Sequence, residues 1–446
     1  MAPLRCTFSA LFALVPLLLA TPAQAQRCND DGSVQQSSTP AVADPAASSD
    51  PRAQLQNLVD LALSRSKQVG AAYLLKLAAD AEIEESKAQH LPTVSVGATL
   101  GHVGTIVSGV TTTRGILGRG TVSASMPVWD FGRIDKLTEW RRQLSDAARF
   151  GQSNAEEQVA LQTVSLALDR SRYTLQAQVY GQFVKRMSCL VDALDIIAKA
   201  DKGRSSELVQ AQKSLQQAQL SLDQTVSVLK QVEVRLAHFV GDQLPPPAGM
   251  ISVLAQVPPQ ADLENDVLLA ADVAQATAAA KAQRSYAESV KAGLLPSVSL
   301  QVSGDQSYHA IRQTDWSGGV AVNIPILQPG SDSTLLAAVR RAQAANLQRD
   351  DTIESKRYRV REMYESATSA LDRAKSIVDI LRNSDRVRAS TLLQWQQLGR
   401  RSLFDVMAAE GDYYSMRIAH VNALFDAEQV VAMMWSQGRG VMTPLR

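Results

Sequence analysis

Two stretches of the chain carry the same pattern, and this pattern decides the fold. Residues 87–96 read Lys-Ala-Gln-His-Leu-Pro-Thr-Val-Ser-Val, and residues 291–300 read Lys-Ala-Gly-Leu-Leu-Pro-Ser-Val-Ser-Leu. In both, a helix-forming run stops at a Leu-Pro pair, because the residue before a proline is pushed out of the α region. Apolar and small polar residues then alternate. Each stretch therefore predicts a helix followed directly by a β-strand.

Two further matches follow in the same order along the chain. Residues 121–128 (Thr-Val-Ser-Ala-Ser-Met-Pro-Val) correspond to residues 319–326 (Gly-Val-Ala-Val-Asn-Ile-Pro-Ile), and residues 205–211 resemble residues 402–408. Matches that recur in one order indicate an internal duplication. Each copy is expected to contain a helix, a β-hairpin and two very long helices.

Composition divides the chain of 446 residues into segments. The start has Arg5, an apolar stretch and the cleavage pattern Ala23-Gln24-Ala25, which together are typical of an export signal. The expected segments, in chain order, are a signal peptide at 1–25, a disordered polar tail at 26–51, a first repeat at 52–240 with its hairpin at 93–129, a proline-rich linker at 241–265, a second repeat at 266–436 with its hairpin at 297–326, and a C-terminal tail at 437–446.

The expected strands have one apolar face and one small or polar face. The apolar set contains Val94, Val96, Val122, Val298, Leu300 and Val320, and serines such as Ser95 and Ser299 occupy the other face. A soluble sandwich would explain this alternation, but it needs more strands than four, and the helical remainder offers none. Strands of bilayer length with this pattern favour a transmembrane barrel. The segments between the strands, Val103 to Gly118 and Gln306 to Trp316, are expected to be extracellular loops.

Four strands cannot close a barrel, so the chain is expected to combine its strands with those of identical copies. Two, three or four copies would supply enough strands. A barrel of about eight strands fills with its own side chains, whereas larger barrels leave a lumen. Four strands per chain therefore predict an oligomer, but they do not determine how many copies it contains.

Long stretches without proline follow each hairpin, at 134–200, 205–240 and 331–442. Apolar and small residues recur within them at intervals of three or four, as in Ala211, Leu215, Ala218 and Leu222. This spacing predicts helices that pack along coiled-coil seams. Many seam residues are small, so they allow helices to approach closely but bury little apolar surface each. We therefore expect the chain to gain stability from assembly.

Charge and motif content exclude several classes of function. The chain has 45 Lys plus Arg against 44 Asp plus Glu, so no basic field for nucleic acid is expected. The cysteines Cys6, Cys28 and Cys189 and the five histidines lie far apart in sequence, so neither a metal site nor a cofactor is expected. No nucleophile elbow, H-E-x-x-H motif or phosphate-binding loop occurs, and an enzyme is not expected.

The chain resembles the TolC family of outer-membrane channel proteins from about residue 52 to residue 436. The likeness is carried by the two Leu-Pro strand starts, by Pro127-Val128-Trp129-Asp130-Phe131-Gly132 at the first strand-to-helix turn, and by Pro325-Ile326-Leu327-Gln328-Pro329-Gly330 at the second. Residues 399–409 (Gly-Arg-Arg-Ser-Leu-Phe-Asp-Val-Met-Ala-Ala) resemble the family's turn at the periplasmic tip, and residues 203–211 are their counterpart.

The resemblance implies a mainly α protein with a small β part. Four strands from each chain would form a trimeric barrel of twelve strands in the outer membrane, and long helices would continue it into the periplasm. It also implies a homotrimer in contact with outer-membrane lipid, a periplasmic adaptor, and an inner-membrane ABC or proton-driven transporter. The tip residues expected to contact the adaptor are Gly203, Ser205, Gly399 and Ser402.

The resemblance further implies a gate at the helix tips. It assigns the closing arginine to Arg401, an acidic partner to Glu207, and an acidic ring that attracts cations to Asp405. Two positions depart from the family pattern, because Gln396 replaces a tyrosine and Ala408 replaces a second ring carboxylate. Most surface ion pairs contribute only about 0 to 1 kcal/mol, so Arg400 and Arg401 can also be read as solvated charges at a turn.

Three functions are compatible with these observations. The first is the exit duct of a tripartite export system, and the absence of a lipid-anchor cysteine favours type I protein secretion slightly. The second is the outer-membrane channel of a drug or metal efflux pump. A periplasmic coiled-coil adaptor is the third, although it would not need two pairs of amphipathic strands.

Overall fold

A computed structural model describes residues 50–107, 110–246, 254, 256–308, 312–398 and 401–445. The expected signal peptide, nearly all of the N-terminal tail, and Gly399 lie outside the described residues. The chain divides into two compact units. The larger unit holds Ser49–Leu175, Val226–Leu381 and Ile418–Arg446, and the smaller unit holds Gln176–Thr225 and Arg382–Arg417.

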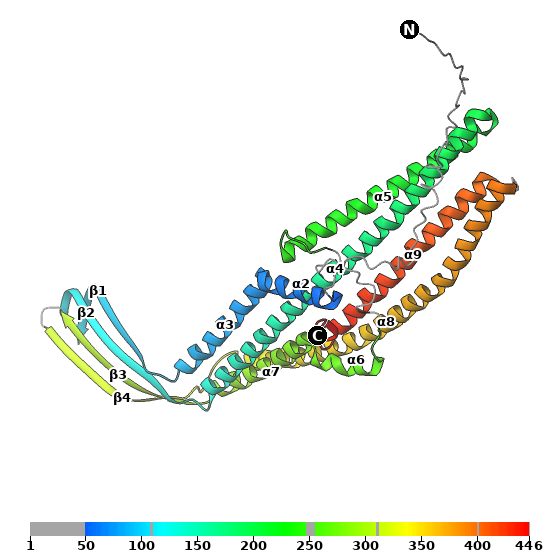
Figure 1. Cartoon of the computed structure of the whole chain (residues 1–446). Helices are drawn as coiled ribbons and strands as arrows, with labels where there is room; N and C mark the ends of the chain where they lie inside the picture. The colour runs from blue at the N-terminus through cyan, green and yellow to red at the C-terminus, as the bar shows by residue number, and fades with distance from the viewer. Residues whose placement is uncertain are drawn as a thin grey trace, which may run out of the picture. The chain divides into compact units, whose positions relative to one another are not determined.

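The described residues of the larger unit form one sheet of four strands. These are β1 (Thr93–Val107), β2 (Val110–Trp129), β3 (Ser297–Tyr308) and β4 (Arg312–Asn323), and neighbouring strands are antiparallel in the order β1-β2-β3-β4. Figure 1 shows the four strands side by side. The two hairpins of the repeat therefore join through β2 and β3, and β1 and β4 are the edges.

The strands are longer than the sequence predicted. The prediction that Val103 to Gly118 and Gln306 to Trp316 are loops is wrong for most of both segments, because they belong to strands. Thr105 pairs with Thr113, and Gln306 pairs with Thr314, so the ladders continue through both segments. Their content of Ser, Gly and Asp indicated loops, but pairing with a neighbouring strand overrode this local preference. At the other end, β4 stops at Asn323, before Pro325, which cannot donate to a ladder.

A β-bulge near the end of β2 changes which residue lies on the apolar face of the sheet. Pro127 pairs with Ser299 but Trp129 pairs with Val298, so Val128 is the extra residue. Trp129, and not Val128, therefore joins the apolar face at this end of β2. A period of two read along the sequence cannot detect such a shift.

Short helices precede each hairpin in the larger unit. They are α2 (Pro51–Arg65) and α3 (Lys67–Ala88) in the first repeat, and α6 (Gln260–Asp266), η2 (Val267–Leu269) and α7 (Ala271–Ala292) in the second. The helix α6 begins directly after Pro259 and occupies the end of the segment expected to be linker. Prolines restrict only the residues beside them, so the linker composition did not reveal this helix.

Four long helices complete both repeats: α4 (Arg133–Ala200) and α5 (Ser205–Val240), then α8 (Ser331–Leu393) and α9 (Leu403–Ser436). The helices α4 and α5 coincide to within one residue with the proline-free stretches at 134–200 and 205–240, and α8 and α9 together lie within the third stretch, 331–442. Within the larger unit, α4 contacts α3 through Ser86 and Thr138, whose hydroxyl oxygens lie 3.0 Å apart. It also contacts α7, where the rings of Trp140 and Tyr286 lie 5.0 Å apart.

The core of the larger unit is apolar and draws on both repeats. Leu55 and Val59 of α2, Val164 and Leu168 of α4, and Phe425 of α9 are completely buried in it. The C-terminal segment, expected to be a tail, also packs here, since Val441 and Leu445 are buried. Its backbone is held by Glu157, which accepts from Val441 N at 2.7 Å.

The smaller unit has its own core. Met187 and Leu194 of α4, Ala211 of α5, and Leu403 and Val406 of α9 are buried together. The helix α8 ends in a π-helical turn, η3 (Gln394–Leu398). Across the described parts of the chain, no helix is both long enough and apolar enough to cross a membrane.

Candidate functional site

Hydroxyl groups form a continuous row across the polar face of the sheet. The register aligns Ser95 with Ser123, Ser123 with Ser303, and Ser303 with Ser317. The Oγ atoms of Ser95 and Ser123 lie 2.8 Å apart, as do those of Ser303 and Ser317. One small hydroxyl from each strand therefore meets at one level, and this surface is suited to contact with water.

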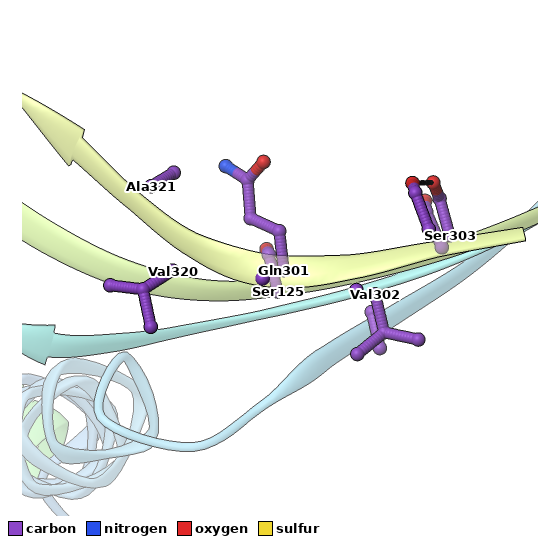
Figure 2. Close-up of a pocket in the computed structure, with 11 residues that line it drawn as sticks. Ser125, Gln301, Val302, Ser303, Val320 and Ala321 are labelled. Atoms are coloured by element: carbon purple, nitrogen blue, oxygen red, sulfur yellow. Dashed lines mark hydrogen bonds between the residues drawn. The ribbon is translucent and has the colours of Figure 1, made fainter.

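A hollow of about 500 Å³ lies on the sheet beside this row. Figure 2 shows that Ser125, Gln301 and Ser303 point to one side of the strands, whereas Val302 and Val320 point to the other. Alternating residues of one strand thus face two different environments. The expected division into a polar and an apolar face is present in the structure.

Charged groups follow the hydroxyl row on the same polar face. Asp305 lies directly opposite Asp315 in the register, and Nε of Arg119 lies 3.8 Å from Oδ2 of Asp305. The arginine offsets the repulsion between two opposed carboxylates. No group of three His, Cys, Asp or Glu residues suited to a metal ion occurs among the described residues.

The opposite face of the sheet is apolar and exposed. Among its residues, the strongly exposed ones are Val94, Val96, Leu100, Ile116, Val122, Val302, Trp316, Val320 and Val322. Contiguous apolar surface of this extent is rare on a soluble monomer and indicates contact with lipid or protein.

The first strand-to-helix turn is built by Asp130. Its carboxylate accepts from Gly132 N at 3.0 Å and from Ile134 N at 2.8 Å, so it satisfies amides at the start of α4. Phe131 and Gly132 have φ of 56° and 78°, so the chain reverses through two left-handed residues. Pro127 lies at the β2 bulge. In the second repeat, Pro325 follows β4, and Gly330, with φ of 87°, precedes α8.

The helix tips of the smaller unit are capped by side chains. Asp201 accepts from Gly203 N at 3.0 Å, and Ser205 begins α5. At the other tip, Ser402 N donates to Asp405 at 3.2 Å and Asp405 N donates to Ser402 Oγ at 3.2 Å. This reciprocal pair is a capping box, which starts α9.

Of the expected gate residues, the structure brings Arg401 to Asp405 but not to Glu207. Nη1 of Arg401 lies 3.9 Å from Oδ2 of Asp405, and its Nε donates to Gln394 at 3.2 Å. Glu207, near the start of α5, has one buried carboxylate oxygen for which the described residues offer no hydrogen-bond partner. Gln396 lies in the π-helical turn, and Ala408 is exposed on α9.

A buried ionic cluster in the smaller unit was not predicted from the sequence. Glu410 of α9 is fully enclosed and contacts Arg186 of α4 and Arg388 of α8. The signal was present, because Leu403, Met407, Glu410 and Tyr414 recur at intervals of four and three. A carboxylate within such an apolar stripe indicates a buried charge with partners on other helices.

A second buried carboxylate lies on α9 in the larger unit. Glu428 is only 2% exposed, and neither of its carboxylate oxygens has a hydrogen-bond partner in the described chain. Burial raises the pKa of Glu428 to about 8. Burial also lowers the pKa of His420 on the same helix. Glu428 is therefore protonated at neutral pH.

Comparison with known proteins gives matches in sequence and in fold. Residues 267–432 match the family described as outer membrane efflux protein, which is not a family of enzymes. The chain is 28% identical over 295 residues to outer membrane efflux protein BepC of Brucella suis, and the match covers 63% of each protein. The chain thus spans less than two thirds of the length of this curated relative.

Two solved structures illustrate the likeness of fold. The outer membrane protein VceC of Vibrio cholerae has a TM-score of 0.74 and 16% identity, covering 86% of this chain and 97% of that one. The open state of the MtrE outer membrane channel of Neisseria gonorrhoeae has a TM-score of 0.72 and 17% identity, covering 87% and 91%. In the sequence of its second repeat the chain is similar to outer membrane efflux proteins, and in fold both repeats are similar to these solved outer membrane proteins.

Proposed function

We propose that three copies of this chain form an exit duct in the outer membrane, which passes small molecules from an inner-membrane transporter and its periplasmic adaptor to the outside. One observation carries the proposal: a four-stranded sheet with two free edges, one exposed apolar face and one hydroxyl-lined face. In lipid every backbone amide and carbonyl needs a partner, so the edges β1 and β4 require strands from other copies.

The sheet supports a barrel with its apolar face toward lipid and its serine row toward the lumen. Joining β4 of one copy to β1 of the next satisfies both edges and repeats the same contact around a closed ring. The ends of the hairpins, after Val107 and Tyr308, are proposed to face the exterior. The number three comes from the family, because strand count alone also permits other closed rings.

Helix surfaces next to the sheet edges support the same contact. The helix α3 leads into β1 and exposes Leu74 (64%), while α8 follows β4 and exposes Leu347 (70%). At 1.5 Å per residue, Leu74 lies about 21 Å before the end of α3 and Leu347 about 24 Å after the start of α8. If β4 pairs with β1 of the next copy, these leucines come to similar depths and cover each other.

Cysteine cross-linking tests this arrangement. In a background without the native cysteines, Leu74→Cys with Leu347→Cys should give covalently linked trimers after mild oxidation in membranes. Each single variant is a matched control and should give none. Cross-linked dimers that never extend to trimers, or a monomer mass for the mature protein in mild detergent, would contradict the proposal.

Small-molecule efflux is the favoured cargo class. The sequence favoured protein secretion slightly, but the matched family and relative are described as efflux proteins, which supports efflux instead. Cross-linking in cells followed by mass spectrometry identifies the inner-membrane partner. A proton-driven pump among the cross-linked proteins supports efflux, and an ABC transporter with a secreted protein in transit supports secretion.

We propose that Arg401 and Glu207 form the lock of a gate at the helix tips and that Asp405 attracts cations at its entrance. Within one chain Arg401 contacts Asp405 and Gln394 and not Glu207, so the proposed lock would join Arg401 to the Glu207 of a neighbouring copy. Arg401→Ser with Glu207→Gln should raise single-channel conductance in planar bilayers, and Asp405→Ala should lower cation selectivity without widening the pore. Unchanged conductance in the double variant, with trimers verified, rejects Arg401 and Glu207 as the lock. The tip residues Gly203, Ser205, Gly399 and Ser402 are proposed to contact the adaptor.

A further inference from the structure

One arginine lies on the apolar face of the sheet, near the end of the hairpin that joins β3 and β4. In the register Arg312 pairs with Tyr308, and Trp316 pairs with Gly304. Paired residues share a face and alternate residues along a strand return to it, so these side chains lie on the same face as Val302. A charge in the middle of lipid is strongly disfavoured, so Arg312 requires a position near the surface of the membrane.

Neutral groups hold the Arg312 side chain. Its guanidinium carbon lies 5.4 Å from the centre of the Tyr308 ring. When the Gln306 amide is oriented to satisfy both of its ends, its oxygen accepts from Nε of Arg312 at 2.7 Å and from Nη2 at 2.5 Å. On the polar face Arg119 pairs with Asp305, whereas no described carboxylate forms an ion pair with Arg312. The neutral contacts orient the guanidinium but do not compensate its charge.

The register gives the height of this charge along the sheet. Trp129 pairs with Val298 at one end of β3, and Tyr308 lies ten residues further along the same strand. At about 3.4 Å per residue this distance is about 34 Å, which a strand tilt of 35–45° reduces to about 24 to 28 Å of height. The apolar band of a transmembrane barrel is about 25 Å tall and has aromatic residues at both interfaces. With Trp129 at one interface, Tyr308 and Arg312 lie at the other.

The position and the chemistry together select a ligand. In the proposed orientation the hairpin ends face the exterior, so Arg312 meets the outer leaflet. The lipid of that leaflet, lipopolysaccharide, carries phosphate groups on a sugar and several acyl chains. A guanidinium matches phosphate oxygens with its fork of N–H donors. Trp316 is 85% exposed and lies four residues nearer the midplane, at a depth suited to acyl chains.

We propose that Gln306, Tyr308 and Arg312 form a binding site for a phosphate group of lipopolysaccharide, with Trp316 against the acyl chains of the same lipid. The inference rests on the proposed function, because it requires the hairpin ends to face the exterior. Three copies would carry three such sites at one height. These sites would oppose movement of the duct along the membrane normal, and they lie on the face turned away from the lumen.

Native mass spectrometry of the mature protein in mild detergent tests the site. The protein is titrated with lipid A that carries both phosphates, with dephosphorylated lipid A, and with phosphatidylglycerol. The wild type should prefer the phosphorylated lipid A. Arg312→Gln should weaken its binding roughly tenfold, as expected for the loss of a charge-assisted contact, and Arg312→Lys should retain part of the affinity.

Arg119→Gln is the matched control. Arg119 pairs with Ser307, one residue from Tyr308 in the register, but it lies on the polar face. This variant removes the same charge at nearly the same height and should bind lipid A as the wild type does. Tyr308 supplies a second pair of variants: Tyr308→Phe keeps the ring beside the guanidinium and should keep most of the affinity, whereas Tyr308→Ala should lose much of it.

The lipids and variants give distinct outcomes. Undiminished binding in Arg312→Gln, or an equal loss in Arg119→Gln, overturns the site. Equal affinity for dephosphorylated lipid A overturns the role of phosphate, and equal affinity for phosphatidylglycerol overturns the assignment to lipopolysaccharide. The site lies within one hairpin, so a monomer can be titrated in the same way. A monomer whose binding depends on Arg312 contradicts the trimeric duct and supports the site, whereas a trimer whose binding is independent of Arg312 contradicts only the site.

Discussion

Glu428 should make the stability of the helical core depend on pH. It lies on α9 between Phe425 and Ala432, both completely buried in the apolar core of the larger unit, and its carboxylate oxygens have no hydrogen-bond partner in the described chain. Burial raises its pKa from 4.5 to about 8. The perturbation is Glu428→Gln, which keeps the shape of the side chain and removes its ionisation.

The sign follows from proton binding. Below pH 4.5 the carboxyl is protonated in both the folded and the unfolded chain, and its contribution to stability is complete. Between pH 4.5 and about 8 only the folded chain holds the proton, so the free energy of unfolding falls as pH rises. Each pH unit is worth about 1.4 kcal/mol, so the loss at pH 7 amounts to about 3 kcal/mol per protomer.

The assay is thermal unfolding of the detergent-solubilised protein, followed by helical circular dichroism at one heating rate from pH 5 to pH 8. Wild type and Glu428→Gln should melt together near pH 5, and the variant should melt at progressively higher temperature as pH rises. Asp412→Asn removes an exposed carboxylate from the same helix. Its melting temperature should differ from that of the wild type by the same amount at every pH. A difference between wild type and Glu428→Gln that stays constant across this range would refute the reasoning.

Three further changes test the faces, the C-terminal segment and the first turn. Val96→Arg, on the apolar face that is proposed to contact lipid, should cost about 2 to 4 kcal/mol if this face lies near the bilayer midplane, and it should reduce the yield of the proposed trimers, whereas Ser95→Arg should be tolerated; equal losses would contradict the facing assignment. Gly440→Ala should lower the melting temperature, because Gly440 has φ of 98° and an added Cβ would lie 2.7 Å from a carboxylate oxygen. The matched Gly411→Ala, with open space in α9, should instead add about 0.5 to 1 kcal/mol. Asp130→Ala should cost about 1 kcal/mol in chemical denaturation, and Asp130→Asn should recover most of it.

Local patterns were sufficient for most of the fold. Leu-Pro pairs ended the helices before both hairpins, and the proline-free runs predicted α4 and α5 to within one residue and the stretch that holds α8 and α9. These features depend on backbone sterics and on side-chain periods of two and of three to four, which neighbouring residues in the chain determine by themselves. The duplication then indicated that both halves share one plan.

Strand length and side-chain partners required the tertiary structure. The ladders run through segments with loop-like composition because a paired strand satisfies backbone groups whatever its local preference, and the extra residue Val128 depends on the neighbouring strand. The same limit applies to the two buried carboxylates of α9. Their spacing placed Glu410 and Glu428 on apolar stripes. Only the packing of other helices gave Glu410 two arginines and left Glu428 without a hydrogen-bond partner among the described residues, because burial and ion pairing are set by residues distant in sequence.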